Sequence, residues 1–348
     1  MIFYLFMRAY VRTVLFFYFK KLKVIGLENI PKNEAVLFVA NHENALLDSI
    51  TLACTNNNRA YVLSRASIFN NPLIKKIFNA LRMIPIYRMR DGWQSINKNN
   101  EVFRACYKLL NNKQSIIIFP EGDHHLNRRV RTLSKGFTRI VFGALENYKD
   151  LQIYIVPVGI NYDSHVAYPQ SISLYYGKAF LANHFYDADE VHRSTRQLIA
   201  KTSDELKKLT VHVEDLTTYE ATISKLKMYH PDFLNPLETN NLLNNLNKKL
   251  PLKPMKKSTN LGYQIIFILV ILGSWLPFLI WKLLKPQIND PIFIGTFRFG
   301  IMVSLVPIFC LFQSFLIYLF FGLNMSIYFM VGCLSLSLLL KWMPHRYS

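Results

Sequence analysis

The sequence predicts a layered α/β domain, a mixed sheet flanked by helices, with an N-terminal interfacial helix before it and an all-α membrane region after it. Short apolar runs alternate with helical stretches in the first half of the chain. A charge-poor tail covers residues 261–340. The formal net charge of +19 is concentrated beside the apolar segments. We therefore divide the chain into an N-terminal helix (1–23), an α/β domain (24–188), a helical extension with a basic linker (189–257) and a hydrophobic region (258–348).

The first segment reads MIFYLFMRAYVRTVLFFYF. It is a poor signal peptide, because arginines interrupt it and no small-residue cleavage site follows. As a helix it places Arg8 and Arg12 one turn apart on one face with aromatic residues around the rest, which favours a helix lying in the membrane interface. The alternative is a spanning helix whose two arginines snorkel to the surface.

The run AVLFVA is the best-defined strand of the next segment, within a predicted strand at 34–40. It does not alternate polar and apolar residues, as expected for a strand covered on both faces. It delivers Asn41 and His42 to its C-terminal end, the usual place for a site in an open α/β sheet. We predict the other strands at 24–30, 62–64, 84–87, 115–119 and 153–158, and helices at 46–54, 72–81, 97–110 and 135–146.

The tail contains the membrane segments. Residues 261–281 and 300–321 each reach the roughly 20 apolar residues that cross a bilayer core, and 326–340 is shorter. If 261–281 spans once, the basic loop at 282–298 faces outward, against the positive-inside trend. We favour the alternative, in which this segment is re-entrant, broken near residues 273–277, and only 300–340 forms a hairpin that turns at 322–325.

The basic excess, 41 Lys and Arg against 22 Asp and Glu, indicates a membrane rather than a nucleic acid. It clusters beside apolar segments, where basic residues bind anionic lipid headgroups and mark the cytoplasmic side. The clusters are Arg8, Arg12, Lys20, Lys21 and Lys23, and Lys248, Lys249, Lys253, Lys256 and Lys257. We expect an integral membrane protein whose α/β domain faces the cytoplasm. The four cysteines have no paired spacing, which fits a reduced compartment.

Polar residues follow several of the predicted strands. His42 and Asp48 follow the first buried strand, Arg88 follows IPIY, and Glu121 and Gly122 follow SIIIFP. Further basic residues come next: Arg128, Arg129, Arg131 and the pair Lys135-Gly136. Taken singly, each has a structural explanation, because turns favour Pro and Gly and a core histidine is common.

Their order along the chain forms four blocks: NHENALLD (41–48), IPIYR (84–88), FPEG (119–122) with LSKG (133–136), and IVPVGI (155–160). Over residues 17–177 this set resembles the glycerolipid acyltransferase family, the 1-acylglycerol-3-phosphate and glycerol-3-phosphate acyltransferases. The resemblance implies transfer of a fatty acyl group to glycerol-3-phosphate or 1-acylglycerol-3-phosphate in phospholipid synthesis. Acyl-CoA or acyl carrier protein is the donor substrate, and no further cofactor is implied.

Acyl transfer to a hydroxyl needs a base, and we expect His42 to be that base with Asp48 orienting it. No acyl-enzyme is required. The phosphate of a lipid acceptor is expected to pair with Arg88 and Lys135, with Arg128, Arg129 or Arg131 in reserve. Glu121 and Gly122 resemble the acceptor-binding pair of the family. Gly136 follows Lys135 in LSKG and belongs to the same expected substrate-binding set. Residues 84–87 and the apolar segments are expected to line the acyl path.

The spacing of His42 and Asp48 departs from the family, which has four intervening residues where this chain has five. One added residue in a regular helix rotates a side chain by about 100°. The pair survives if the added residue lies in the loop before the helix, with Asn44 as N-cap, or in a π-bulge. Glu43 is the fallback acid.

Rival interpretations remain open. Asp123, His124 and His125 invite a metal site, but adjacent histidines in a strand point to opposite faces, and we expect no metal. A hydrolase would need a nucleophile, and the chain has no Gly-x-Ser-x-Gly elbow. An acyltransferase for another lysolipid or an aminolipid, or an inactive lipid-binding protein, also fits. His165 and His212 lie in polar stretches and are expected at the surface.

Overall fold

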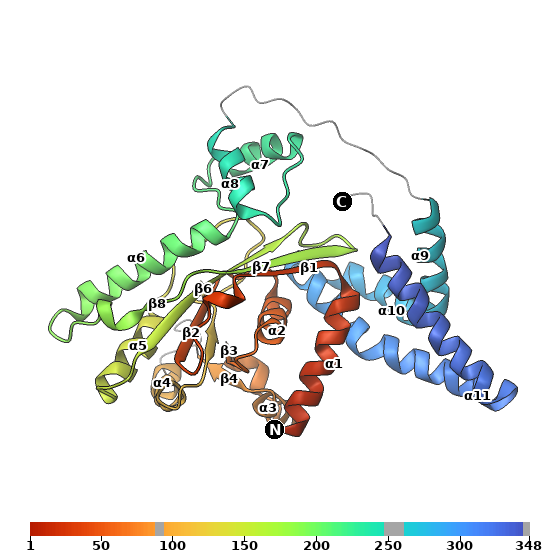
Figure 1. Cartoon of the computed structure of the whole chain (residues 1–348), viewed down its shortest axis with the longest axis horizontal. Coiled ribbons are helices and arrows are strands. Elements are labelled where there is room, and N and C mark those ends of the chain that lie inside the picture. The colour runs from red at the N-terminus through yellow and green to blue at the C-terminus, as the bar shows by residue number, and fades with distance from the viewer. Residues whose placement is uncertain (88–93, 247–260, 344–348) are drawn as a thin grey trace.

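The computed structural model describes residues 1–87, 94–246 and 261–343. Its centre is an eight-stranded mixed sheet with the strand order β1-β7-β6-β2-β5-β3-β4, and β8 pairs with β6. Helices cover both faces of the sheet, and α9, α10 and α11 lie together at one end of the molecule (Figure 1). The predicted fold class, a layered mixed α/β sheet followed by an apolar helical region, is confirmed.

Strand β2 (Ala35–Ala40) lies in the middle of the sheet, and all six of its residues are buried. It pairs in parallel with β5 (Ile116–Ile118) and β6 (Ile153–Tyr162). The sheet is mixed because β6 runs antiparallel to β7 (Gln170–Tyr176) and β8 (Phe180–Leu181). The remaining strands are β1 (Phe19–Ile25), β3 (Tyr61–Arg65) and β4 (Met83–Ile86).

The alternate residues of β2 enter two separate cores. Leu37 and Val39 pack with α4 (Gln94–Asn111) and α5 (Gly136–Asn147), on the face that α6 (Val191–Leu209) also covers. Val36 and Phe38 pack on the other face with α1 (Ile2–Tyr18) and α2 (Ala45–Thr55). The unalternated sequence of β2 follows from this two-sided burial. Three shorter helices complete this part of the chain: α3 (Pro72–Ala80), α7 (Tyr219–Met228) and α8 (Pro236–Asn244).

The N-terminal segment differs from the prediction. Helix α1 ends at Tyr18 rather than at residue 23, because Phe19 opens a strand that pairs with β7. The strand predicted at 24–30 therefore begins earlier, and Leu27–Asn29 is a short 3₁₀ turn. Strands β7 and β8 were not predicted. An apolar run such as FFYF suits a helix and a strand equally well, so tertiary pairing decides the boundary.

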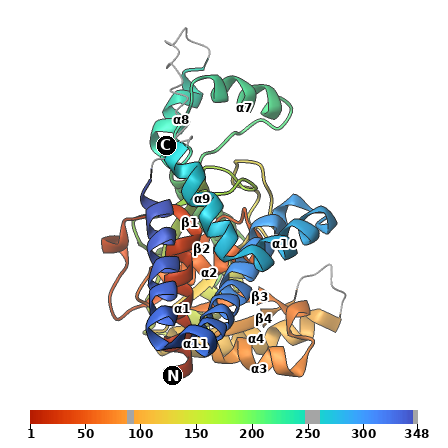
Figure 2. The same ribbon diagram turned by 90° about the vertical axis from the view of Figure 1, so that its right-hand side faces the viewer.

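The C-terminal region is folded back on itself. Helices α9 (Leu261–Gly273) and α10 (Trp275–Leu284) meet at a bend of 93°, so a single straight span over 261–281 is wrong. Helix α11 (Ile294–Trp342) doubles back at Gly322, where φ is +82° (Figure 2). The Ser314 and Ser326 hydroxyls lie 2.7 Å apart, whereas 12 residues of straight helix would separate them by about 18 Å. The predicted hairpin turn is confirmed, and by length and composition the segment Pro291–Trp342 can cross a membrane.

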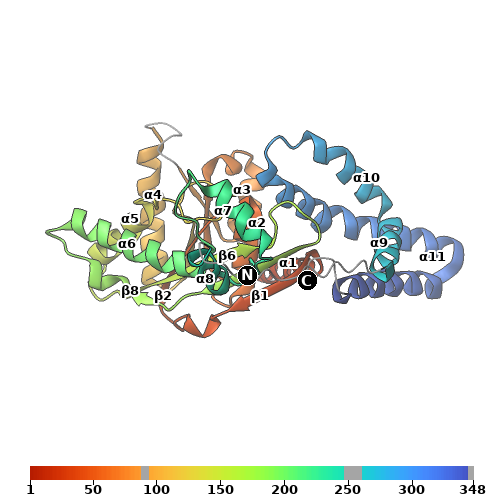
Figure 3. The same cartoon turned by 90° about the horizontal axis from the view of Figure 1, so that it is seen from above.

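Both ends of the α11 hairpin are fastened to the α/β domain, while its turn points away from it (Figure 3). The Tyr18 hydroxyl donates to the Gly295 carbonyl over 3.2 Å at the first end. At the other end, Lys20 Nζ donates to the Leu340 carbonyl over 2.7 Å. Lys20 also lies 5.5 Å from the centre of the Tyr263 ring at the start of α9. These contacts place the start of α9 and both ends of the α11 hairpin beside residues 18–20 of the α/β domain.

Candidate active site

The residue after β2 fixes the start of the site. Asn41 is buried, and its side chain extends the pairing of β2 with β6 beyond the end of the strand. Its amide donates to the Ile160 carbonyl over 2.9 Å, and the Ile160 N–H donates to Asn41 Oδ1 over 2.7 Å. Because two hydrogen bonds to Ile160 fix the Asn41 side chain, the position of the next residue, His42, at the end of the strand is defined.

His42 and Asp48 are in direct contact. His42 Nδ1 lies 2.8 Å from Asp48 Oδ2. The same oxygen accepts the backbone N–H groups of Glu43 over 2.8 Å and Asn44 over 2.7 Å. The other oxygen, Oδ1, accepts the Tyr162 hydroxyl over 2.6 Å. The Asp48 side chain is fully buried and accepts four hydrogen bonds, so its position is strongly determined.

The added residue between His42 and Asp48 is accommodated in the loop. Helix α2 starts at Ala45, whose φ is +36°, and it contains no π-bulge. Asn44 stands at the N-cap position, but its side chain makes no capping hydrogen bond. Asp48 instead turns back to accept the N–H groups of the loop. Of the two structural solutions considered, the loop is correct, and Asn44 occupies the predicted N-cap position without a side-chain hydrogen bond.

Glu43 faces away from His42. Its Oε2 lies 2.7 Å from His165 Nε2, and its Oε1 accepts the Asn41 amide over 3.2 Å. Glu43 is therefore not the partner of His42. The predicted surface position of His165 and His212 is also wrong, since their side chains are only 11% and 8% exposed. Strand β6 is four residues longer than predicted, which brings the polar sequence NYDSH beside the site.

The His42 ring is held between two aromatic rings. It stacks on Phe119 with ring centroids 4.3 Å apart, and the His124 ring meets it edge-on at 5.5 Å. Nδ1 is engaged by Asp48, and no hydrogen bond to Nε2 is present among the described parts of the chain. The side chain is 15% exposed, so Nε2 is the nitrogen that can meet a substrate.

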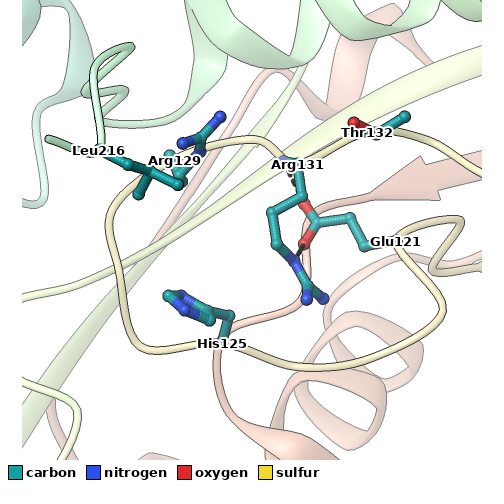
Figure 4. Close-up of a pocket in the computed structure, with 6 residues that line it drawn as sticks. All are labelled: Glu121, His125, Arg129, Arg131, Thr132 and Leu216. Atoms are coloured by element: carbon teal, nitrogen blue, oxygen red, sulfur yellow. Dashed lines mark hydrogen bonds and ion pairs between the residues drawn. The ribbon is translucent and has the colours of Figure 1, made fainter.

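Glu121 of the FPEG block lines a pocket of about 350 Å³ (Figure 4). Arg131 Nε donates to Glu121 Oε2 over 3.0 Å, and burial raises the pKa of Glu121 while Arg131 opposes that rise. Gly122 adopts φ +72°, a conformation that favours glycine, although an added Cβ would meet no atom within 4 Å. The pocket is lined by Glu121, His125, Arg129, Arg131, Thr132 and Leu216. The His125 N–H donates to the His42 carbonyl over 3.1 Å, which joins the pocket to the loop that contains His42.

The predicted basic ligands fall into different environments. Arg128 is buried and donates to the carbonyls of Tyr162 over 2.7 Å and Asp163 over 3.0 Å. It therefore supports the fold, and its reserve assignment as a phosphate ligand is wrong. Lys135 is exposed at the N-cap of α5, and Gly136 is the first residue of that helix. Arg88 lies outside the described residues.

Asp123, His124 and His125 do not converge on one point. His124 Nδ1 lies 3.9 Å from Asp123 Oδ1. His125 Nδ1 accepts the Asn127 N–H over 2.8 Å. Within residues 1–87, 94–246 and 261–343, no group of three or more His, Cys, Asp or Glu side chains could hold a metal ion.

Tyr162 is a site residue that the sequence did not indicate. Burial first, and the charge of Asp48 second, raise the pKa of Tyr162 well above 10, so its hydroxyl remains a donor to the carboxylate. We expect Tyr162→Phe to lower the free energy of unfolding by about 1.5–3 kcal/mol, as for a lost hydrogen bond to a charged group. Tyr175→Phe is the control, because its hydroxyl donates to an uncharged acceptor, the Leu234 carbonyl, over 3.1 Å. Chemical denaturation in micelles measures both, and equal losses would contradict the assignment.

A pH dependence follows from three histidines, His124, His125 and His212, whose pKa is lowered chiefly by burial. Nδ1 of His212 accepts the Val130 N–H over 2.9 Å, and His125 likewise accepts a backbone N–H, so both rings are neutral acceptors. The unfolded chain binds these protons near about pH 6.5, the folded chain only at lower pH. The contribution of these neutral histidines to the free energy of unfolding is therefore fully present above about pH 6.5. It is lost as the pH falls through their folded-state pKa values.

We expect the melting temperature in micelles to fall between about pH 7.5 and about pH 5.5. The double variant His125→Gln/His212→Gln should show a smaller fall. Equal slopes for the parent and the double variant would contradict this origin of the pH dependence.

Comparison with known proteins agrees with this geometry. Residues 21–161 match the family model described as Acyltransferase, so this segment of the chain is similar to that family. The resemblance drawn from the four blocks is thereby confirmed. The C-terminal helices lie outside the matched segment.

Two curated relatives are 1-acyl-sn-glycerol-3-phosphate acyltransferases. The chloroplastic protein of Arabidopsis thaliana is 29% identical over 119 residues, which is 34% of this chain and 32% of that protein. The protein of Borreliella burgdorferi is 27% identical over 133 residues, which is 38% of this chain and 51% of that protein. The matched region thus spans about a third and about half of their lengths. The crystal structure of the 1-acyl-sn-glycerophosphate acyltransferase PlsC from Thermotoga maritima is 19% identical, with a TM-score of 0.38, and covers 54% of this chain and 72% of that one.

Proposed function

We propose that this protein is a membrane-bound O-acyltransferase that moves a fatty acyl group from acyl-CoA or acyl carrier protein to glycerol-3-phosphate or 1-acylglycerol-3-phosphate. The observation that carries the proposal is the contact of His42 Nδ1 with the buried Asp48 carboxylate, 2.8 Å long, which leaves Nε2 for a substrate. The names of the two relatives support the same reaction and acceptor class.

The chemistry follows from the orientation of the ring. Asp48 accepts a hydrogen bond from the Nδ1–H group, so the lone pair lies on Nε2. Nε2 removes the hydroxyl proton of the acceptor while its oxygen attacks the thioester carbonyl. The tetrahedral intermediate then collapses, the carbon–sulfur bond breaks, and the imidazolium returns its proton to the leaving thiolate. Asp48 stabilises the imidazolium, and no acyl-enzyme forms.

The acceptor phosphate is assigned to the basic side of the pocket. Arg129 and Arg131 line it together with Glu121, whose carboxylate holds Arg131 Nε at 3.0 Å. A guanidinium held in this way can offer its remaining N–H groups to a phosphate. Lys135 and Arg88 complete the proposed set, and Gly122 leaves the backbone accessible.

The membrane arrangement is part of the proposal. The start of α9 and both ends of the α11 hairpin contact residues 18–20 of the α/β domain. Such contacts favour the re-entrant form of residues 261–287, in which every basic loop lies on the side of the catalytic domain. By the positive-inside trend that side is the cytoplasm.

Cysteine labelling tests this topology. Gln287→Cys lies in the exposed loop after α10, and Asn324→Cys lies at the turn of the α11 hairpin. With Cys310 and Cys333 replaced by alanine, we expect an impermeant maleimide to label Gln287→Cys only in inside-out vesicles and Asn324→Cys only in right-side-out vesicles. Burial raises the pKa of Cys54 to about 11 and of Cys106 to about 12, so these thiols stay unreactive. Labelling of both variants from one side would overturn the hairpin.

A mass-spectrometric assay tests the substrate class. The purified full chain is given acyl-CoA or acylated carrier protein with glycerol-3-phosphate, 1-acylglycerol-3-phosphate, a lysophospholipid with a larger headgroup, or an aminolipid. We expect transfer to one of the first two acceptors. Transfer only to the others would retain an acyltransferase but overturn the proposed acceptor, and transfer to none would favour an inactive lipid-binding protein.

A further inference from the structure

The C-terminal region reaches the candidate active site. The 3₁₀ turn Pro291–Phe293 precedes α11 and carries Phe293, whose ring meets the His124 ring edge-on at 5.1 Å. His124 in turn meets His42 edge-on at 5.5 Å. The three rings therefore form a continuous series of edge-to-face contacts from the C-terminal region to the proposed base.

A second contact involves the loop between His42 and Asp48. Gly295 lies so close to Asn44 that a Cβ added to the glycine would be 2.8 Å from both polar atoms of the Asn44 amide. Asn44 is fully buried, and neither amide atom has a hydrogen-bond partner among the described residues. The backbone N–H of Asn44 is one of the donors to Asp48. A displacement of Asn44 would therefore act directly on the carboxylate that orients His42.

A third contact involves the loop after β6, which contains His165. Arg298 is only 9% exposed, and its guanidinium donates to the carbonyls of Val166 over 3.0 Å and Ala167 over 2.9 Å. These residues directly follow His165, which pairs with Glu43. Arg298 Nε also donates to the Tyr18 hydroxyl over 3.1 Å. One short segment thus contacts both loops that flank the His42–Asp48 pair.

We propose that Phe293, Gly295 and Arg298, at the start of the α11 hairpin, are positioning residues that hold the His42 loop. Anchoring alone does not require these contacts, because an anchor can be joined to the domain by any linker. These residues connect the membrane hairpin to the proposed base. The position of the hairpin therefore also affects the positions of His42 and Asp48 during acyl transfer. This inference rests on the proposed function for its kinetic consequences.

Two substitutions test it. We expect Phe293→Ala and Gly295→Ala each to lower kcat by about 10- to 100-fold, as for a displaced catalytic group, while KM for both substrates changes little. Phe293→Tyr should retain most of the parent kcat, unlike Phe293→Ala, because tyrosine keeps the aromatic ring. The double variant Asn44→Ala/Gly295→Ala should recover activity relative to Gly295→Ala, because it removes the amide that the new methyl group meets.

Phe297→Ala is the matched control. Phe297 lies in the first turn of α11, two residues after Gly295, but its side chain is 46% exposed. We expect Phe297→Ala to leave kcat unchanged. Hydrogen exchange of residues 41–48 gives a readout that does not depend on turnover, and it should accelerate in Phe293→Ala and Gly295→Ala but not in Phe297→Ala. Parent-like kcat or exchange in the first two variants would overturn the inference. If the parent transfers no acyl group, the proposed function fails, and the exchange measurement still decides whether the segment positions the loop.

Discussion

His42→Ala is expected to lower the rate of acyl transfer by about 10²- to 10⁴-fold, the usual contribution of a positioned general base. The substitution removes the imidazole that contacts the Asp48 carboxylate through Nδ1 and is left with Nε2 for a substrate. It leaves Asp48 with three of its four donors, so the loop and the helix after it keep their support. We therefore expect the loss in kcat without loss of membrane binding or of the folded state.

The measurement is the initial rate of product formation for the parent and the variant at matched protein concentration in the same micelles. His192→Ala is the control, because His192 is exposed on α6, away from the dyad residues and the pocket lining. Transfer by His42→Ala at the parent rate would remove the proposed mechanism.

Asp48→Asn has the second largest expected effect. Three N–H donors converge on Oδ2, whereas Oδ1 meets only the Tyr162 hydroxyl, which can rotate to accept. The amide of asparagine can therefore place its carbonyl oxygen at Oδ2 and its NH₂ towards Tyr162. The hydrogen bond to His42 is kept, but the negative charge that stabilises the imidazolium is lost. We expect kcat to fall by about 10²- to 10⁴-fold with little change in KM.

Asp48→Ala separates the catalytic role from the structural one. It leaves buried donors without an acceptor, each costing roughly 1–3 kcal/mol. Thermal unfolding should therefore show a large loss of stability for Asp48→Ala and a small loss for Asp48→Asn. A parent-like kcat for Asp48→Asn would show that charge at this position does not assist the reaction.

Much of the fold was predictable because local patterns agree with it. The buried run of β2 indicated a strand covered on both faces, and the polar residues after the strands indicated the edge of the sheet where the site lies. The hydropathy of the C-terminal region identified its helices, and the glycine at residue 322 indicated their turn. Strand β7 was missed because its polar and apolar residues do not give the pattern of a central strand, although it lies between β1 and β6.

The parts of the site that could not be predicted depend on contacts between distant residues. The spacing of His42 and Asp48 is resolved by backbone N–H groups that the carboxylate accepts after the loop has turned. Tyr162 reaches Asp48 from 114 positions away. Arg128 has the sequence context of a surface cation, yet its guanidinium is turned inward onto backbone carbonyls. The sequence does not distinguish Arg128 from Arg131. The packed structure does, because Arg128 is buried whereas Arg131 lines the pocket.

The role of Arg298 was hidden for the same reason. In the sequence it is one cation in a loop between apolar segments, which suggests membrane topology and nothing more. In the structure it is buried against the loop after β6 and joins the hairpin to the neighbourhood of His42. Hydropathy locates a membrane segment, but it carries no information on which face of that segment meets the catalytic domain.

A rapid-quench experiment with a thioester donor labelled in its acyl group tests most directly whether His42 activates the acceptor hydroxyl for direct transfer. The parent should pass the label to the acceptor only when the acceptor is present, and no label should remain on the protein at any time. His42→Ala should leave the label on the donor under the same conditions. Label bound covalently to the protein before the acceptor is added, or transfer by the variant as fast as by the parent, would contradict the account.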